Sequence, residues 1–183
     1  HPPIPGFDRS AGGVPPASQA PAQANTTAQD IWAVLSPLTD PEIPVVSLRD
    51  MGILRDVRRV GGEWHVVITP TYSGCPAMGQ IEDDVKALLQ AHGLQGRVVT
   101  QLAPAWTTDW LSEDTKARLR AYGIAPPAAR AGQAQPLRFR PRIRCPRCES
   151  ARTEQLAAFG ATACKALYRC LQCREPFDYF KPY

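Results

Sequence analysis

Cys145-Pro146-Arg147-Cys148 and Cys170-Leu171-Gln172-Cys173 form two Cys-x-x-Cys pairs that decide how the last part of this chain folds. The 21 residues 149–169 separate the pairs, a spacing at which four thiolates can meet at one tetrahedral ion. Thiolate ligands in that geometry favour Zn²⁺. We therefore predict that Cys145, Cys148, Cys170 and Cys173 bind zinc in a β-rich zinc ribbon over residues 142–183, because about 40 residues cannot build an adequate core without such a staple.

The part of the chain before the ribbon alternates between helical and strand patterns. Apolar residues at helical spacing predict helices over residues 30–38, 81–92 and 112–122. Alternating residues on either side of Gly61-Gly62 predict a β-hairpin over 53–60 and 64–69, and a third strand follows over 97–102. Between the first helix and the hairpin, the prolines of residues 40–44 predict an extended loop. The predicted fold class is α+β, a small mixed sheet with helices, followed by the ribbon.

Composition divides the chain further. Residues 1–28 are rich in Pro, Ala, Gly, Gln and Ser and predict a disordered tail, and residues 126–141 have a similar composition with Arg and predict a linker. The α+β domain would then span residues 29–125. We find no apolar signal-peptide core and no run of about 18 apolar residues, so we expect no membrane segment. Six cysteines without a signal sequence favour a cytoplasmic location, and metal ligation over disulfides.

The net charge is +4, and arginines gather near the first Cys-x-x-Cys pair. Six of them fall within fifteen residues: Arg138, Arg140, Arg142, Arg144, Arg147 and Arg152. The run is interpreted either as a solvated basic approach to the ribbon or as a surface that docks nucleic acid or an acidic partner. We favour the first interpretation, since the stretch resembles an extended linker, and we expect no nucleic-acid partner.

Cys75 lies apart from both pairs, directly before Pro76 and the second predicted helix. Proline is favoured at the first helical position, which makes Cys75 a candidate N-cap. The positive end of the helix dipole would favour a thiolate there, suited to a soft metal or to redox chemistry. The alternative is a small residue packed at a tight turn, and spacing alone favours neither.

Two further features have a functional and a structural interpretation. Asp40 and Glu42 flank a rigid proline and are either hard ligands near Cys75 or ordinary turn residues. Cys164, outside both pairs, is either a small buried hydrophobe or an additional ligand. We favour burial for Cys164, because four thiolates already close the zinc site. Catalytic residues are not predicted, since the sequence contains no Gly-rich phosphate loop, Gly-x-Ser-x-Gly or His-Glu-x-x-His motif.

Several motifs carry a resemblance to known families. Asp-Pro-Glu-Ile-Pro-Val (40–45), Asp-Met-Gly (50–52) and Thr-Pro-Thr-Tyr-Ser-Gly-Cys-Pro-Ala (69–77) resemble the iron–sulfur-assembly domain family that includes SufT-like proteins. Pro-Ala-Trp-Thr-Thr-Asp-Trp (104–110) and the segment 159–170 are similar to the D-subunit family of bacterial phenylacetyl-CoA epoxidase systems, also called the J subunit of phenylacetate-CoA oxygenase. The resemblance runs from about Asp30 to the last residue.

The resemblance implies a non-catalytic accessory subunit in aerobic phenylacetate breakdown. Such a protein would help to assemble or deliver an iron–sulfur or diiron centre to another epoxidase subunit, with the ferredoxin-type reductase subunit as the expected client. It implies that Cys75 contacts transient iron or a cluster, that Asp40 and Glu42 are the family's acidic pair, and that Cys164 is less securely a packing residue. Zn²⁺ is the expected resident metal. A structural subunit that bridges the oxygenase complex is the alternative.

Overall fold

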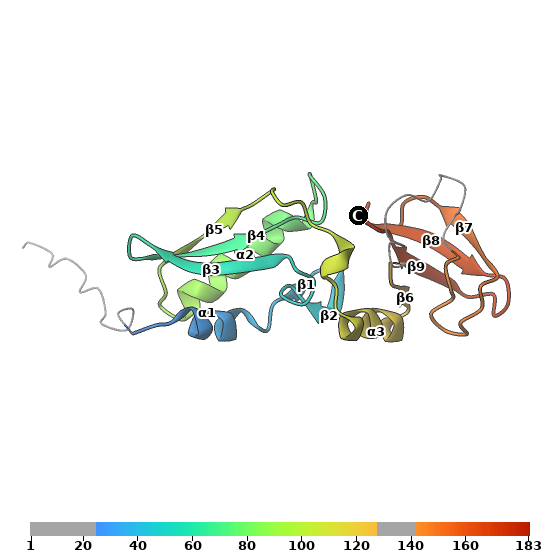
Figure 1. The fold of residues 1–183 in the computed structure, drawn as a ribbon, viewed down its shortest axis with the longest axis horizontal. Coiled ribbons are helices and arrows are strands. Elements are labelled where there is room, and N and C mark those ends of the chain that lie inside the picture. Colours follow the sequence, from blue (N-terminus) through green and yellow to red (C-terminus); the bar gives the residue numbers. More distant parts are fainter. Residues whose placement is uncertain (1–24, 128–141) are drawn as a thin grey trace, which may run out of the picture.

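The computed structural model describes residues 25–127 and 142–183. Most of the predicted tail (1–28) and linker (126–141) lies outside these residues. Along the described chain, an α+β part is followed by a β-rich part at the other end of the molecule (Figure 1). This confirms the predicted fold class.

A three-stranded mixed sheet forms the centre of the α+β part. Strands β3 (Leu54–Val60) and β4 (Glu63–Ile68) are antiparallel, and β4 is parallel to β5 (Gly96–Thr100). Gly61 and Gly62 make the turn between β3 and β4. Their φ angles of 58° and 89° lie in the left-handed region, which glycine adopts without strain. The parallel pair needs a crossover, which α2 (Ala77–Ala91) supplies. The hairpin and the third strand are therefore confirmed.

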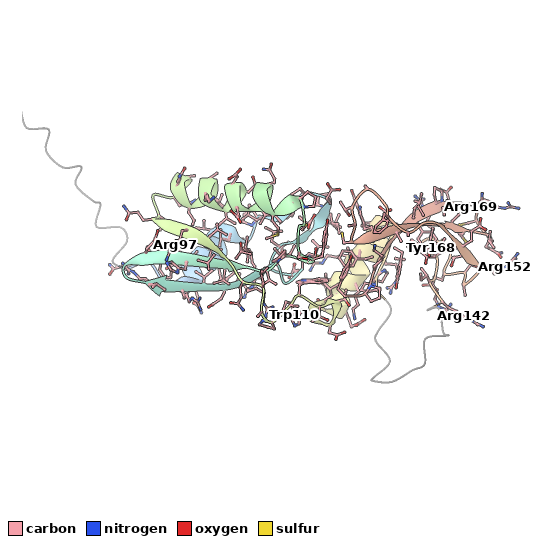
Figure 2. All side chains as sticks on the ribbon, turned by 90° about the horizontal axis from the view of Figure 1, so that it is seen from above. Arg97, Trp110, Arg142, Arg152, Tyr168 and Arg169 are labelled. Atoms are coloured by element: carbon pink, nitrogen blue, oxygen red, sulfur yellow. The ribbon has the colours of Figure 1, made fainter. Side chains whose placement is uncertain are left out.

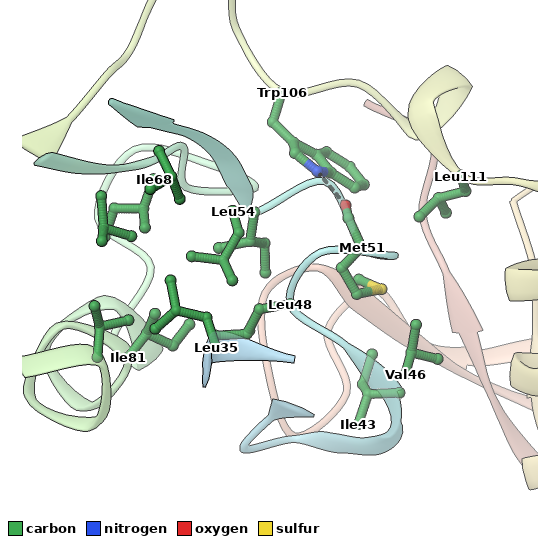
Figure 3. Packing of buried hydrophobic residues seen from close by; sticks show 14 of the residues in the cluster. Leu35, Ile43, Val46, Leu48, Met51, Leu54, Ile68, Ile81, Trp106 and Leu111 are labelled. Atoms are coloured by element: carbon green, nitrogen blue, oxygen red, sulfur yellow. Dashed lines mark hydrogen bonds between the residues drawn. The ribbon is translucent and has the colours of Figure 1, made fainter. Parts of the chain in front are cut away.

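Helices α1 (Ala28–Leu35) and α2 pack on each other and on this sheet. Figure 3 shows Leu35 of α1, Ile81 of α2 and Ile68 of β4 in one cluster of buried side chains. α2 begins four residues before the predicted start and ends one residue before the predicted end, next to Gly93 with a φ of 66°. Burial of one apolar stripe on each helix is what fixes both helices on the sheet.

The segment predicted as an extended loop contains a small hairpin instead. β1 (Thr39–Asp40) pairs antiparallel with β2 (Ile43–Ser47). The Oδ1 atom of Asp40 accepts a hydrogen bond of 2.7 Å from the Glu42 backbone N–H, a side-chain turn that tightens the reversal at Pro41. The hairpin matters because it holds both acidic residues at one corner of the core.

The last helix of the α+β part leads directly into the ribbon. After the short 3-10 helix η2 (Thr108–Trp110), α3 (Glu113–Tyr122) begins at the N-cap Ser112 and ends at Gly123 in the left-handed region, as predicted. The next two residues form β6 (Ile124–Ala125), which pairs in parallel with β9 (Pro176–Phe180). With β7 (Thr153–Ala157) and β8 (Lys165–Cys170), these strands make a sheet of order β6-β9-β8-β7.

The two parts share one core where β9 ends. Phe180 is 1% exposed and belongs to the buried cluster of the α+β part. Its ring lies 5.9 Å from that of Trp106, whose indole N–H donates a 2.8 Å hydrogen bond to the Met51 carbonyl (Figure 3). The Tyr183 carbonyl accepts a 3.0 Å bond from the Thr107 hydroxyl. The ribbon is therefore packed against the α+β part and not merely tethered to it.

Candidate metal sites

The four cysteines of the Cys-x-x-Cys pairs come together at the far side of the ribbon. The Sγ atoms of Cys145 and Cys173 lie 3.7 Å apart, those of Cys148 and Cys170 lie 3.5 Å apart, and all four lie within 4.8 Å of one another. A tetrahedral zinc with Zn–S bonds of about 2.3 Å would hold its sulfurs roughly 3.8 Å apart. The donor set and its spacing fit a zinc ion.

The two pairs build matching turns. Glu149 and Arg174, each one residue after the second cysteine of a pair, have positive φ of 59° and 68°. In the second turn the backbone N–H groups of Gln172 and Cys173 point at the Cys170 sulfur, at 3.4 and 3.5 Å. These turns aim two sulfurs in one direction, which is the local geometry that the spacing predicts.

The charges of the four sulfurs also indicate a cation. Burial opposes ionisation of Cys170, but the backbone N–H groups of Cys173 and Gln172 lower its pKa to about 6. A hydrogen bond to the Glu175 backbone lowers the pKa of Cys173, whereas burial and contact with the other sulfurs raise it to about 12. One thiolate thus forms more readily than the next, and a cation among the four sulfurs would favour their ionised forms.

A second group of chemically active side chains lines a cavity of about 300 Å³. The cavity has three walls: the β1–β2 turn, the loop and first turn of α2, and the β7–β8 loop of the ribbon. Its lining includes Asp40, Glu42, Cys75 and Cys164, over an apolar base that includes Ile43, Met51 and Phe180. Ile43 and Met51 appear in Figure 3. Asp40 and Glu42, the predicted acidic residues, therefore line the same cavity as Cys75.

Cys75 is half-buried in the loop before α2. It is not the N-cap that the sequence predicts: α2 begins at Ala77 with Pro76 as N-cap, so Cys75 lies one residue outside. The N–H of Cys75 donates to the Tyr72 carbonyl at 3.2 Å, and its own carbonyl accepts from Met78 at 3.2 Å. Pro76 takes the cap position because its fixed φ suits a helix start.

The two acids differ in environment. Asp40 is 8% exposed, and burial raises the pKa of its carboxyl group, although the backbone N–H groups of Glu42 and Ile43 oppose the rise. Glu42 is exposed. Asp40 thus lies inside the cavity, whereas Glu42 belongs to its rim.

Cys164 is the residue whose position the sequence left unsettled. It is half-buried, packs against the core of the α+β part, and lines the same cavity as Cys75. Burial raises the pKa of its thiol, although a hydrogen bond with Thr162 opposes this. It is therefore neither sealed in the ribbon core nor part of the zinc quartet, and only the packing of the ribbon on the α+β part brings it there.

The predicted basic run is partly outside the described residues, which exclude Arg138 and Arg140. Arg142, Arg144, Arg147 and Arg152 are exposed. Figure 2 shows Arg142 and Arg152 on the ribbon, away from the α+β part. Of the helices in residues 25–127 and 142–183, none is long and apolar enough to cross a membrane.

Two families match successive parts of the chain. Residues 28–101 match the family described as iron-sulfur cluster assembly protein, and this range includes Cys75, Asp40 and Glu42. Residues 129–181 match the PaaD zinc beta ribbon domain, a range that includes all four cysteines of the quartet and Cys164.

Individual relatives match the same parts of the chain. A Bacillus anthracis structure titled domain of unknown function DUF59 is 28% identical, with a TM-score of 0.46, over 50% of this chain and 90% of its own. A "Fe-S protein maturation auxiliary factor" of Porphyromonas gingivalis is 33% identical over 51% of this chain and 90% of its own length. An Escherichia coli protein, named as the putative D subunit of 1,2-phenylacetyl-CoA epoxidase, is 49% identical over 90% of this chain and 96% of its own. The chain belongs to the family of this phenylacetyl-CoA epoxidase D subunit.

Proposed function

We propose that this chain is a non-catalytic maturation factor of a phenylacetyl-CoA epoxidase system. It would assemble an iron–sulfur or diiron centre, or deliver it to a partner subunit, with the ferredoxin-type reductase subunit as the client. The observation that carries the proposal is the cavity that Cys75, Asp40 and Glu42 all line. The names of the Escherichia coli and Porphyromonas gingivalis relatives support the pathway and the maturation role.

The chemistry of this cavity suits a metal in transit. One thiolate with carboxylates offers an incomplete ligand set, which can accept iron and release it to a better site. Iron or a cluster is here the cargo of the protein. Cys145, Cys148, Cys170 and Cys173 would hold the resident zinc, which staples the ribbon (142–183) and adds no reactivity, because a closed four-thiolate site has no open position.

Replacement of Cys75 tests the proposal. The chain is co-expressed with the epoxidase subunits as wild type, as Cys75→Ala, or omitted, and the iron and cluster content of each purified partner is measured. We expect Cys75→Ala to lower the iron content of the client to the level found without this chain, while the variant keeps its circular dichroism spectrum and one zinc per chain.

Ser73→Ala is the matched control, because Ser73 is exposed in the same loop and does not line the cavity. It should support full maturation of the client. Normal client iron content with Cys75→Ala would sink the proposal. If that variant also formed a stoichiometric complex with the epoxidase subunits, the alternative of a structural bridging subunit would be favoured.

A further inference from the structure

We propose that Cys164 supplies a second sulfur ligand to the cavity of Cys75, so that the transfer site is built jointly by the ribbon and the α+β part. The ligand class is a thiophilic divalent cation, with Fe²⁺ as the relevant case, held by two thiolates and the Asp40 carboxylate. This inference rests on the proposed function and names the ligand set of the same site.

The first support is a contact between the α2 loop and the ribbon, beside which both thiols lie. Burial raises the pKa of the Tyr72 hydroxyl, and the nearby Cys75 and Cys164 thiols raise it further. Tyr72 stacks on Tyr183, with ring centroids 6.4 Å apart, and the Tyr183 hydroxyl donates a 3.1 Å hydrogen bond to the Ala163 carbonyl. Cys75 and Cys164 line the same cavity and thus lie on the two sides of a contact that joins the α2 loop to the ribbon.

The second support is how firmly the ribbon holds Cys164 at this contact. The Cys164 carbonyl accepts a 2.9 Å hydrogen bond from the Lys181 backbone N–H, and the Lys165 N–H donates to the Thr162 carbonyl at 3.2 Å. The Thr162 hydroxyl lies 3.0 Å from the Cys164 sulfur. A loop fixed by its own backbone bonds presents its thiol at one place, which a ligand site requires.

The third support is the charge beside the thiols. Lys165, the residue after Cys164, is buried and forms a 3.2 Å ion pair with Asp178. The charge of Lys165 also favours ionisation of Asp40, against the effect of burial. The cavity therefore contains a buried carboxylate, whose pKa burial raises, in the same lining as two sulfurs. Sulfur and oxygen ligands in this combination suit a first-row divalent metal.

The arrangement also explains why the site would be transient. Among the described residues, the zinc quartet alone brings three or more ligand atoms within 4.8 Å of one another. Cys75, Cys164 and Asp40 border a space of about 300 Å³ without meeting. Cysteine side chains would have to rotate toward the ion, and an ion held in this way leaves more easily than one in a preassembled cage.

Anaerobic Fe²⁺ titration of the full-length, zinc-loaded chain, in competition with a chromophoric chelator, tests the inference. We expect Cys75→Ser and Cys164→Ser each to weaken Fe²⁺ binding at least about tenfold. With Co²⁺ as a spectroscopic probe, each variant should lose about half of the thiolate-to-metal charge-transfer absorption. Gln80→Ala is the matched control, since Gln80 lines the same cavity without a sulfur or carboxylate. Zinc content and circular dichroism verify the fold.

The outcomes separate this inference from the proposed function. Weakened binding in Cys75→Ser with wild-type binding in Cys164→Ser would overturn the two-sulfur site and leave a Cys75-based maturation role standing. Wild-type binding in both variants would overturn the shared site and remove the basis of the proposed function as well. A loss confined to Cys164→Ser would place the metal away from Cys75 and would also overturn the shared site.

Discussion

The two groups of cysteines differ in how closely their sulfurs approach one another in the folded chain. In the quartet, sulfur–sulfur distances of 3.5 and 3.7 Å are close to those around a bound zinc, and they join two similar turns of the ribbon. At the cavity, Cys75 and Cys164 come from two different parts of the chain and share their space with Asp40. One site is assembled by local turns, the other by the packing of the ribbon on the α+β part.

This difference indicates whether each site holds its metal permanently or can exchange it. A four-thiolate site binds its ion as part of folding, so the binding free energy stabilises the folded ribbon. A divided site with an incomplete ligand set binds its ion at the cost of rearrangement, which favours exchange. The number of sulfurs alone does not distinguish the quartet from the cavity site. The parts of the fold that supply the ligands do distinguish them.

The largest expected effect comes from breaking the quartet. Cys145→Ser or Cys173→Ser should unfold the ribbon, because structural zinc contributes roughly 10 kcal/mol or more to folding in such modules. Zinc analysis should show less than one zinc per chain. Far-UV circular dichroism should retain the signal of α1, α2 and α3, whose helices belong to the α+β part.

Cys164→Ser is the control for that experiment, since it removes a cysteine of the ribbon outside the quartet. It should keep one zinc per chain and the full circular dichroism spectrum. A Cys145→Ser or Cys173→Ser variant that still binds one zinc per chain would contradict the assignment of the quartet as the zinc ligands.

The next effect concerns the packing that creates the cavity. Phe180→Ala removes a side chain that is 1% exposed and shared by both parts, so we expect a loss of about 3–5 kcal/mol in the free energy of unfolding, measured with urea. The zinc quartet, which does not depend on this contact, should still bind one zinc. Weak Fe²⁺ binding by this variant would sharpen the comparison, because only the cavity needs the two parts to be packed together.

Phe159→Ala provides the matched control, because Phe159 is 65% exposed in the ribbon. It should change the free energy of unfolding by no more than about 0.5 kcal/mol. A Phe180→Ala variant as stable as Phe159→Ala would show that the ribbon and the α+β part are not coupled through this residue.

The features predicted from the sequence are those with local signals. Gly61-Gly62 marks the β3–β4 turn, Ser112 and Gly123 bound α3, and the Cys-x-x-Cys spacing indicates the quartet. Each turn, helix boundary and Cys-x-x-Cys pair depends on residues within a few positions of one another, although 21 residues separate the two pairs themselves. The structure bears these signals out because tertiary packing has no reason to override them.

The features missed depend on contacts between distant segments. The pairing of β6 with β9 joins residues 124–125 to 178–179, and no pattern in two residues can predict it. The position of Cys164 beside Cys75 likewise follows from aromatic packing around Trp106 and Phe180, and it has no local signature. Apolar spacing placed the start of α2 four residues too late, at Ile81, whereas the position of Pro76 placed Cys75 one residue too close to the helix.

The smallest expected effect lies away from both groups of sulfurs, at the start of α1. The Thr27 hydroxyl accepts a 3.3 Å hydrogen bond from the Asp30 N–H, and the Asp30 carboxylate accepts one of 2.8 Å from the Thr27 N–H. Thr27→Ala removes the hydroxyl and should cost about 1 kcal/mol of stability in urea unfolding. Zinc and Fe²⁺ binding should not change, since this cap touches neither the quartet nor the cavity. A change in either would mean that the sites are less independent of the rest of the fold than their contacts indicate.

The same cap has a pH dependence of known sign. Hydrogen bonds from the Thr27 backbone and hydroxyl lower the pKa of Asp30 below its ordinary value of 3.8. An acid whose pKa is lower in the folded state stabilises the fold above its ordinary pKa, and that contribution is lost as the pH falls through the lowered value. Asp30→Asn should therefore be less stable than wild type near neutral pH, and the difference should shrink as the pH falls below about 4. Urea unfolding of both proteins across this range measures the difference, and a difference that grew on acidification would contradict the capping role of the carboxylate.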